Sequence, residues 1–246
     1  MRITSYGNTI TGSSGINGDN FYISQDQKLF VLADGASGAG KHGKSVMSST
    51  CAAIARQFDF TSSGLPPRNY IDALFHKINA ALIELSQKER NLCFGTVVIA
   101  LIHDCNLWVT TYGDSPAYLR KDGKIMRTAR NRKRYEDMIE DGFITQKQYE
   151  RYISNMHERM WSAFDRFIPE IVPNNVIEQH ALAPGDMFIA CSDGLSDWIA
   201  PEQIFEKIQN CGVNASIDEL IMAARDKALR KQKYFDDITA IAFVIQ

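Results

Sequence analysis

Acidic residues recur where short apolar runs of this sequence meet turns. Asp34 follows the run KLFVLA, and Asp193 follows the segment DMFIACS. Five aspartates occupy such positions: Asp19, Asp34, Asp114, Asp193 and Asp236. If the runs are neighbouring strands, the carboxylates can converge on one rim, where they would repel one another and raise each other's pKa values. Two hard divalent cations such as Mg²⁺ or Mn²⁺, which prefer oxygen ligands, would relieve that repulsion.

An Asp-Gly pair is also a common tight turn, so the motif has two interpretations. We interpret Asp122–Gly123 and Asp141–Gly142 as turns only. Asp34 and Asp193 differ from these, because each follows an apolar run and no obvious returning strand comes next. A glycine beside a ligand would let a backbone carbonyl approach a metal closely.

The hydrophobic pattern predicts the elements that would position these carboxylates. Strands are expected over 20–24, 28–33, 94–102, 106–112, 116–120, 124–128, 175–181, 186–191 and 237–245. Helices are expected over 44–58, 68–88, 201–209 and 216–231, and the polar stretch 131–165 is also expected to be helical. Short turns between consecutive strands require antiparallel pairing. We therefore expect an α+β fold, with antiparallel sheets packed together and helices outside, in one domain over residues 1–246.

Composition narrows the classes of partner. The formal net charge is −2, from 27 basic and 29 acidic residues, which gives no bulk attraction to nucleic acid or to an anionic membrane. The most apolar stretch, 94–102, is too short to span a bilayer, and the first ten residues lack the apolar region of a signal peptide. Five cysteines without ligand-like spacing fit a reducing cytoplasm.

Six segments, in order, resemble motifs of the type 2C metal-dependent (PPM) Ser/Thr protein phosphatases, in their bacterial-like single-domain form. They are NGDNFYI (17–23), VLADGASG (31–38), FGTVVIALI (94–102), YGDSPAYLR (112–120), FIACSDGLSDWI (188–199) and FDDITAIAFVI (235–245). The order is more specific than any one motif. The resemblance implies a four-layer α-β-β-α sandwich with a binuclear Mn²⁺ or Mg²⁺ centre between the sheets.

The resemblance also implies roles for individual residues. Carried over by position, the metal ligands would be Asp19, Asp34, the Gly35 carbonyl, Asp193 and Asp236, with Asp114 serving a third, weaker ion that some members bind. Residues 130–165 would form the flap beside the active site. A water bridging the two cations would be acidified to hydroxide and attack the phosphorus directly, so Asp34 and Asp193 would be catalytic through the metals. The implied substrates are proteins phosphorylated on serine or threonine, and by analogy a cognate Ser/Thr kinase would be a partner.

The sequence departs from the family pattern around phosphate recognition. The family's phosphate-clamping arginine is replaced by Ser14, and the acidic residue beside the first ligand by Gly18. Pro116 replaces a second arginine, and Asp237 stands where the family has asparagine. The candidates to bind phosphate instead are Arg2, Lys41 and Lys44. His42 could protonate the leaving group, since its unperturbed pKa suits that work, or it could be an exposed histidine without a role.

Two other functions remain open on the sequence. Residues 38–45, GAGKHGKS, match a phosphate-binding loop, which predicts a nucleotide hydrolase. Against it, antiparallel hairpins follow where such a protein has a parallel sheet. The departures at Ser14, Gly18 and Pro116 allow instead a non-catalytic phosphatase-like domain that binds a phosphoprotein. The retained carboxylates oppose that interpretation, because a buried acidic cluster is costly to keep without metal.

Overall fold

The computed structural model describes residues 1–36, 40–89, 93, 95–128, 145, 147 and 176–246. Within these ranges the strands form two five-stranded sheets, and every pairing is antiparallel. The first sheet has the order β1 (Ile3–Ile10), β10 (Ile238–Ile245), β9 (Met187–Cys191), β6 (Ala117–Lys121) and β7 (Lys124–Arg127). The second has the order β2 (Asp19–Ile23), β3 (Leu29–Gly35), β4 (Gly95–His103), β5 (Asn106–Tyr112) and β8 (Glu178–Ala181).

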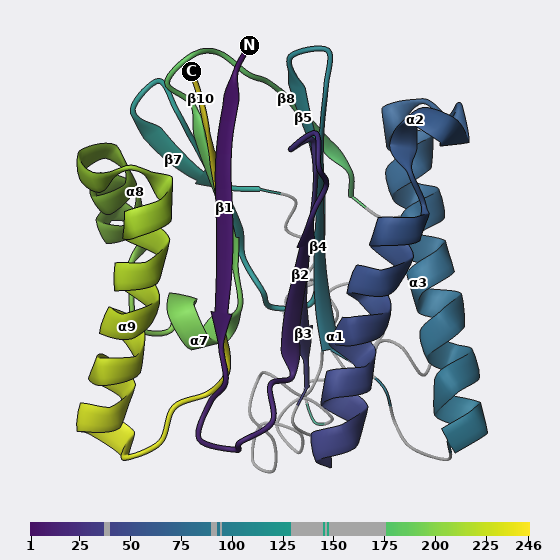
Figure 1. Ribbon diagram of the computed structural model, residues 1–246, viewed down its shortest axis with the longest axis vertical. Coiled ribbons are helices and arrows are strands. Elements are labelled where there is room, and N and C mark those ends of the chain that lie inside the picture. Colours follow the sequence, from purple (N-terminus) through teal and green to yellow (C-terminus); the bar gives the residue numbers. More distant parts are fainter. Residues whose placement is uncertain (37–39, 90–92, 94, 129–144, 146, 148–175) are drawn as a thin grey trace.

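Helices cover the outer face of each sheet, as Figure 1 shows in profile. The first sheet is covered by α8 (Pro201–Cys211) and α9 (Val213–Gln232), and the second by α1 (Gly40–Gln57) and α3 (Pro67–Glu89). Two short helices complete the described elements, α2 (Phe60–Ser63) and α7 (Asp193–Ser196). The predicted α+β fold, a four-layer sandwich, is confirmed.

Three hydrophobic clusters hold the four layers together. The central one lies between the sheets, where Phe243 has its ring centroid 5.1 Å from those of both Phe30 and Phe188. The other two join each sheet to its helices. Burying one such phenylalanine contributes roughly 1.5–3 kcal/mol, so the strand ends are carried on a rigid frame.

The structure contains elements that the sequence did not predict. Strand β1 was not predicted, and it pairs with β10 along its whole length, from Ile3 opposite Ile245 to Ile10 opposite Ile238. The helical turn α7, which Asp193 opens, was not predicted either. Of the predicted flap, 130–165, only Thr145 and Lys147 lie among the described residues. No helix in the described ranges is long and apolar enough to cross a lipid bilayer.

The Asp122–Gly123 turn has the predicted form. Both residues have positive φ, 50° and 74°, between the paired ends Lys121 and Lys124 of β6 and β7. This backbone matches the tight turn that joins twisted antiparallel strands. Asp141–Gly142 lies outside the described residues.

Candidate metal centre

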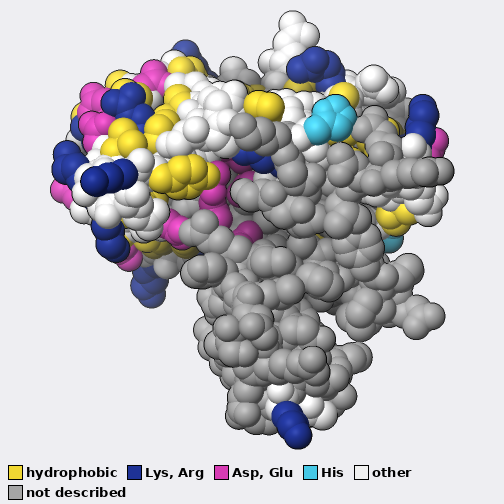
Figure 2. Space-filling view, turned by 90° about the horizontal axis from the view of Figure 1, so that it is seen from below, with side chains coloured by type: hydrophobic (Ala, Val, Ile, Leu, Met, Phe, Trp, Pro, Cys, Tyr) yellow, Lys and Arg dark blue, Asp and Glu magenta, His cyan; other side chains and the backbone are white. Residues whose placement is uncertain are grey.

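The five aspartates come from both sheets and lie at one end of the sandwich. Asp19 begins β2 and is directly opposite Asp34 near the end of β3. In the other sheet, β9 and β10 are neighbours; Asp193 follows the end of β9, and Asp236 precedes the start of β10. Asp114 follows β5. Figure 2 looks onto this end, where acidic side chains lie in a recess bordered by hydrophobic ones.

The pKa of Asp34 shows how closely these charges gather. Burial raises its pKa well above the ordinary value, and four neighbouring carboxylates raise it further. In decreasing order of effect, these are Asp19, Asp193, Asp114 and Asp236. The structure therefore brings together all five carboxylates that the sequence singled out, and the four neighbours oppose ionisation of Asp34.

Asp19 is the most deeply placed of the five, with 5% of its surface exposed. Burial raises its pKa to about 7, although hydrogen bonds from the hydroxyls of Ser192 and Thr239 act in the opposite direction. Its Oδ2 atom is buried and has no hydrogen-bond partner among the described residues. An unpartnered carboxylate oxygen in the interior is costly unless something else satisfies it.

A divalent cation fits this donor set in chemistry, although the side chains are not arranged as a finished site. Within the described ranges, no three Asp, Glu, His or Cys side chains form a group ready to hold a metal ion. The oxygens are nonetheless of the type that Mg²⁺ and Mn²⁺ prefer, and the Oδ2 atom of Asp19 lacks another partner.

The glycines after Asp34 and Asp193 are required by close packing. A Cβ atom on Gly35 would lie 2.1 Å from the carbonyl oxygen of Lys44. A Cβ atom on Gly194 would lie 2.1 Å from the carbonyl oxygen of Asp237. Each Asp-Gly pair is therefore pressed against the backbone of another segment, a reason for glycine that the sequence did not reveal.

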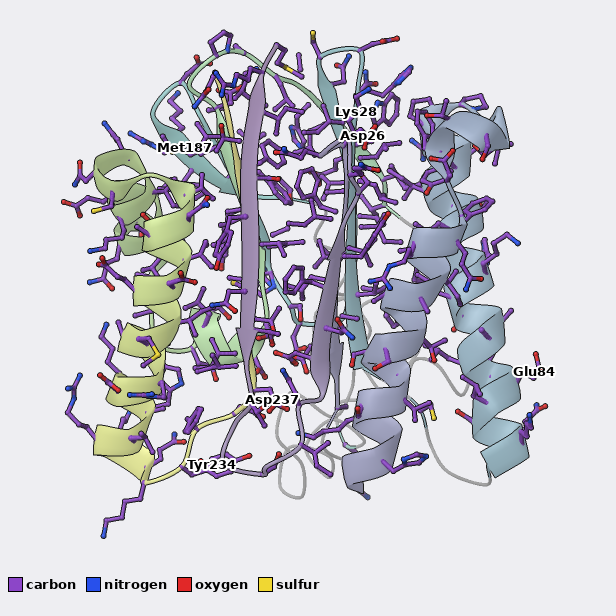
Figure 3. All side chains as sticks on the ribbon, in the orientation of Figure 1. Asp26, Lys28, Glu84, Met187, Tyr234 and Asp237 are labelled. Carbon is purple, nitrogen blue, oxygen red and sulfur yellow. The ribbon has the colours of Figure 1, made fainter. Side chains whose placement is uncertain are left out.

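A buried ion pair lies beside the carboxylates, and sequence reasoning missed it. Lys44 Nζ is 2.6 Å from Asp237 Oδ2, and each side chain is 4% exposed. Burial alone would lower the pKa of Lys44, but its hydrogen bond to Asp237 and the neighbouring negative charges outweigh this effect and raise the pKa. Figure 3 places Asp237 at the end of the sandwich opposite the chain termini.

The three departures Ser14, Gly18 and Asp237 meet at this lysine. Lys44 Nζ also donates to Ser14 Oγ at 3.2 Å. A Cβ atom on Gly18 would lie 2.6 Å from Lys44 Cδ. The sequence did carry a signal for this ion pair, because the three departures occur together. Ser14 replaces an arginine, Gly18 replaces a larger side chain, and Asp237 adds an acidic group.

The candidate phosphate-binding residues are placed differently from one another. Arg2 precedes β1, and the carboxylates lie at the other end of that strand. The eight residues of β1 span roughly 26 Å, so Arg2 is too distant from the carboxylates to bind phosphate there. Lys44 is buried against Asp237, which contradicts its assignment as an accessible phosphate ligand. His42 is exposed on the first turn of α1, and the side chain of Lys41 lies outside the described residues.

Sequence comparison finds phosphatases among the relatives of this chain. No protein-family model matches it. The Ser/Thr protein phosphatase PstP of Mycobacterium tuberculosis is 28% identical over 212 residues, which cover 85% of this chain and 39% of PstP. The protein phosphatase PTC7 homolog fig of Drosophila melanogaster is 26% identical over 219 residues, 84% of this chain and 62% of that protein. The chain thus spans less than two thirds of the length of these relatives.

Solved structures share the fold at lower identity. The M. tuberculosis phosphatase PstP/Ppp superposes with a TM-score of 0.76 at 23% identity, covering 99% of each chain. The PstP catalytic domain in complex with two manganese ions gives 0.74 at 23% identity, again over 99% of each chain. An S. agalactiae Ser/Thr phosphatase gives 0.71 at 18% identity over the full length of both. Together, these comparisons show that the chain is similar in sequence to protein phosphatases and shares its fold with solved Ser/Thr phosphatases.

Proposed function

We propose that this chain is a metal-dependent phosphoprotein phosphatase that hydrolyses phosphoserine and phosphothreonine, and that residues 1–246 form one phosphatase domain. The observation that carries the proposal is the gathering of five carboxylates around Asp34, with an unpartnered buried oxygen on Asp19. The relatives named as protein phosphatases, of which PstP is named a Ser/Thr phosphatase, support the reaction class. The antiparallel sheets do not favour the nucleotide hydrolase that residues 38–45 suggested.

The proposed cofactor is a pair of Mn²⁺ or Mg²⁺ ions, in line with the two manganese ions of the PstP catalytic domain. We assign Asp19, Asp34, the Gly35 carbonyl, Asp193 and Asp236 as the residues that would hold the pair. Asp114 would serve a third, weaker ion. When bound, such ions supply Lewis acidity for activating water and for neutralising the phosphoryl group.

The chain's own hydroxyl groups orient the carboxylates. Asn17 Nδ2 donates to Thr9 Oγ1 at 2.9 Å, and Thr9 Oγ1 lies 2.6 Å from Thr239 Oγ1. The Thr239 hydroxyl in turn bonds to Asp19, whose backbone N–H donates to Asn17 Oδ1 at 2.9 Å. This closed ring fixes one Asp19 oxygen and leaves the other available, which is the role that outer-shell partners have in metal sites.

A second contact supports the opposite side of the cluster. Thr96 is the residue of β4 directly opposite Asp34, and its hydroxyl is hydrogen-bonded to that of Ser115. Ser115 follows Asp114, so the bond ties the Asp114 turn to the strand beside Asp34. The two outer contacts thus support Asp19 and the Asp114 turn, which both belong to the second sheet.

Substrate recognition follows less directly from the residues. We propose phosphorylated proteins as substrates, with a Ser/Thr kinase as the opposing enzyme. His42 stays a candidate for protonating the leaving alkoxide, because it is exposed on α1 close in sequence to the Asp34 loop. The proposal predicts that no covalent phosphoenzyme forms, since none of the assigned residues acts as a nucleophile.

The test is phosphate release from para-nitrophenyl phosphate and from a phosphothreonine peptide, with and without millimolar Mn²⁺. We expect hydrolysis that requires Mn²⁺, stops with chelator and is lost in Asp34→Asn and in Asp193→Asn. Asp122→Asn is the matched control, because Asp122 lies in a β-turn where asparagine tolerates the positive φ. Wild-type rates in either ligand variant would remove the metal assignment, and Mn²⁺ binding without hydrolysis would favour the non-catalytic domain.

A further inference from the structure

Lys44 and Asp237 belong to opposite halves of the sandwich. Lys44 lies on α1, which packs on the sheet that contains Asp19 and Asp34. Asp237 directly precedes β10, in the sheet beside Asp193. Their 2.6 Å contact is almost fully buried, so it joins the two halves at the end where the carboxylates gather.

Both partners press on the glycines that follow candidate ligands. A Cβ atom on Gly35 would clash with the carbonyl oxygen of Lys44, and a Cβ atom on Gly194 would clash with the carbonyl oxygen of Asp237. Because backbone atoms cannot give way as flexible side chains do, these contacts fix the two Asp-Gly segments relative to the pair. The ion pair therefore links the two Asp-Gly segments.

The Asp237 carboxylate also holds both ends of the loop 12–18. It accepts hydrogen bonds from the backbone N–H of Gly12 at 2.7 Å and of Gly18 at 2.8 Å. Gly18 precedes Asp19, and the aliphatic stem of Lys44 fills the space beside Gly18. With Asp236 adjacent in sequence to Asp237, the pair contacts an immediate neighbour of every carboxylate assigned to the two-ion centre.

We propose that the Lys44–Asp237 pair is a brace that sets the spacing of the carboxylates from the two sheets before any cation binds. The inference rests on the proposed metal-dependent function and deepens it. Lys44 is then a positioning residue, not a ligand of the substrate phosphate. Fixing ligands in advance favours binding, because the ordering cost is met during folding.

The positive charge of Lys44 and its position predict opposite changes in cation affinity when the lysine is replaced, so the direction of the change tests the proposal. A cation close to a divalent-ion site repels the ion, so removing it should tighten binding if charge alone matters. If position matters, removal should weaken binding. Lys44→Met keeps much of the aliphatic stem and separates the two cases.

The experiment measures Mn²⁺ binding by calorimetry in wild type, Lys44→Met and the double variant Lys44→Met/Asp237→Asn. The double variant keeps the net charge, and replacing both partners of a buried pair often costs little stability. We expect Mn²⁺ affinity to fall about 10–100-fold in both, the range seen when outer-shell partners of metal sites are removed. In chelator, the urea midpoint of the double variant should stay near that of wild type. Excess Mn²⁺ should restore most of its turnover.

A matched control is the ion pair at the other end of the sandwich. Lys121 Nζ lies 3.8 Å from Asp186 Oδ2, and Asp186 is buried just before β9. Lys121→Met/Asp186→Asn makes the same chemical change, and we expect it to leave Mn²⁺ affinity unchanged. A similar loss there would mean that the effect is general loosening and would overturn the proposal.

The outcomes separate the brace from the proposed function. Unchanged or tighter Mn²⁺ binding in Lys44→Met and in the double variant overturns the brace while wild-type binding stands. If Mn²⁺ binds the variants more weakly than wild type, but wild type itself hydrolyses no phosphate ester, the brace is supported and the phosphatase proposal is refuted. Absence of Mn²⁺ binding by folded wild-type protein refutes both.

Discussion

Asp19 and Asp34 face each other across the antiparallel pair β2–β3, at a position where two like charges meet in the interior. A sheet normally avoids this arrangement, because like charges directly opposite one another are destabilising. Both carboxyls are affected: the pKa of Asp34 is raised well above its ordinary value, and Asp19 is buried with one oxygen that has no partner among the described residues. The metal-free protein should therefore carry a measurable penalty at this pair.

The first prediction concerns the pH dependence of metal-free stability. Burial raises the pKa of Asp19 to about 7 in the folded protein from an ordinary value of 3.8. Between these values the folded state holds a proton that the unfolded chain has released, so the free energy of unfolding falls as pH rises through this window. Asp19→Asn should remove this pH dependence. For a pKa shift of this size, the pH-dependent part of the free energy of unfolding is about 4 kcal/mol.

Urea unfolding of both proteins in chelator at several values between pH 4.5 and 8 measures this difference. We expect the stability of wild type relative to Asp19→Asn to decrease up to about pH 7 and then to level off. Parallel stability curves over the whole range would contradict the prediction.

A second prediction distinguishes Asp114 from the other four aspartates. It follows β5 and stands third among the carboxylates that raise the pKa of Asp34, and we assign it to the third, weaker ion. Asp114→Asn should bind the first two Mn²⁺ ions with affinity within about threefold of wild type, well short of the roughly 10–100-fold that loss of a metal-site partner costs. Calorimetric loss of all Mn²⁺ binding would instead make Asp114 a ligand of the principal pair.

A third prediction concerns Gly194, whose missing side chain admits the Asp237 backbone. Gly194→Ala should destabilise the fold by at least about 2 kcal/mol, because overpacking displaces backbone that cannot move freely. Gly123→Ala is the control: it lies in open space with positive φ, so only a backbone penalty of about 1 kcal/mol applies. Equal thermal shifts in the two variants would show that the close approach at Gly194 is not limiting.

Much of the fold could be predicted from the sequence, because apolar runs and turn residues are local signals. The buried strand predicted over 94–102 is β4, which spans Gly95–His103. Strand β1 was missed since all its residues are partly exposed, so no alternation of polar and apolar residues identifies it. It is an edge strand that pairs with β10, and the residues near it in sequence give no sign of a pairing with the other end of the chain.

The candidate site shows the same division between local and long-range information. The aspartates stood out because each ends or begins an apolar run. The Lys44–Asp237 contact joins residues 193 positions apart, so neither side chain carries a local sign of the other. Residues 38–45 even suggested a phosphate-binding loop, whereas the Lys44 side chain is buried in an ion pair with Asp237.

The last prediction tests the hydroxyl ring that orients Asp19, and two buried threonines make it a matched comparison. The Thr239 hydroxyl bonds to Asp19 and to Thr9, whereas Thr110 Oγ1 is buried and has no partner in the part of the chain that the structure describes. Thr239→Val should lower Mn²⁺ affinity about 10–100-fold, because one Asp19 oxygen loses its support. Thr110→Val should leave affinity unchanged and raise stability by about 1 kcal/mol, since an unsatisfied hydroxyl is removed.

Calorimetry and urea unfolding on the same two samples measure both quantities. If Thr110→Val weakens Mn²⁺ binding as much as Thr239→Val does, the interior as a whole governs the site, and the ring around Asp19 has no particular role. If only Thr239→Val weakens binding, the effect passes through the Asp19 oxygen that this ring fixes, because both substitutions exchange the same groups in buried strand positions.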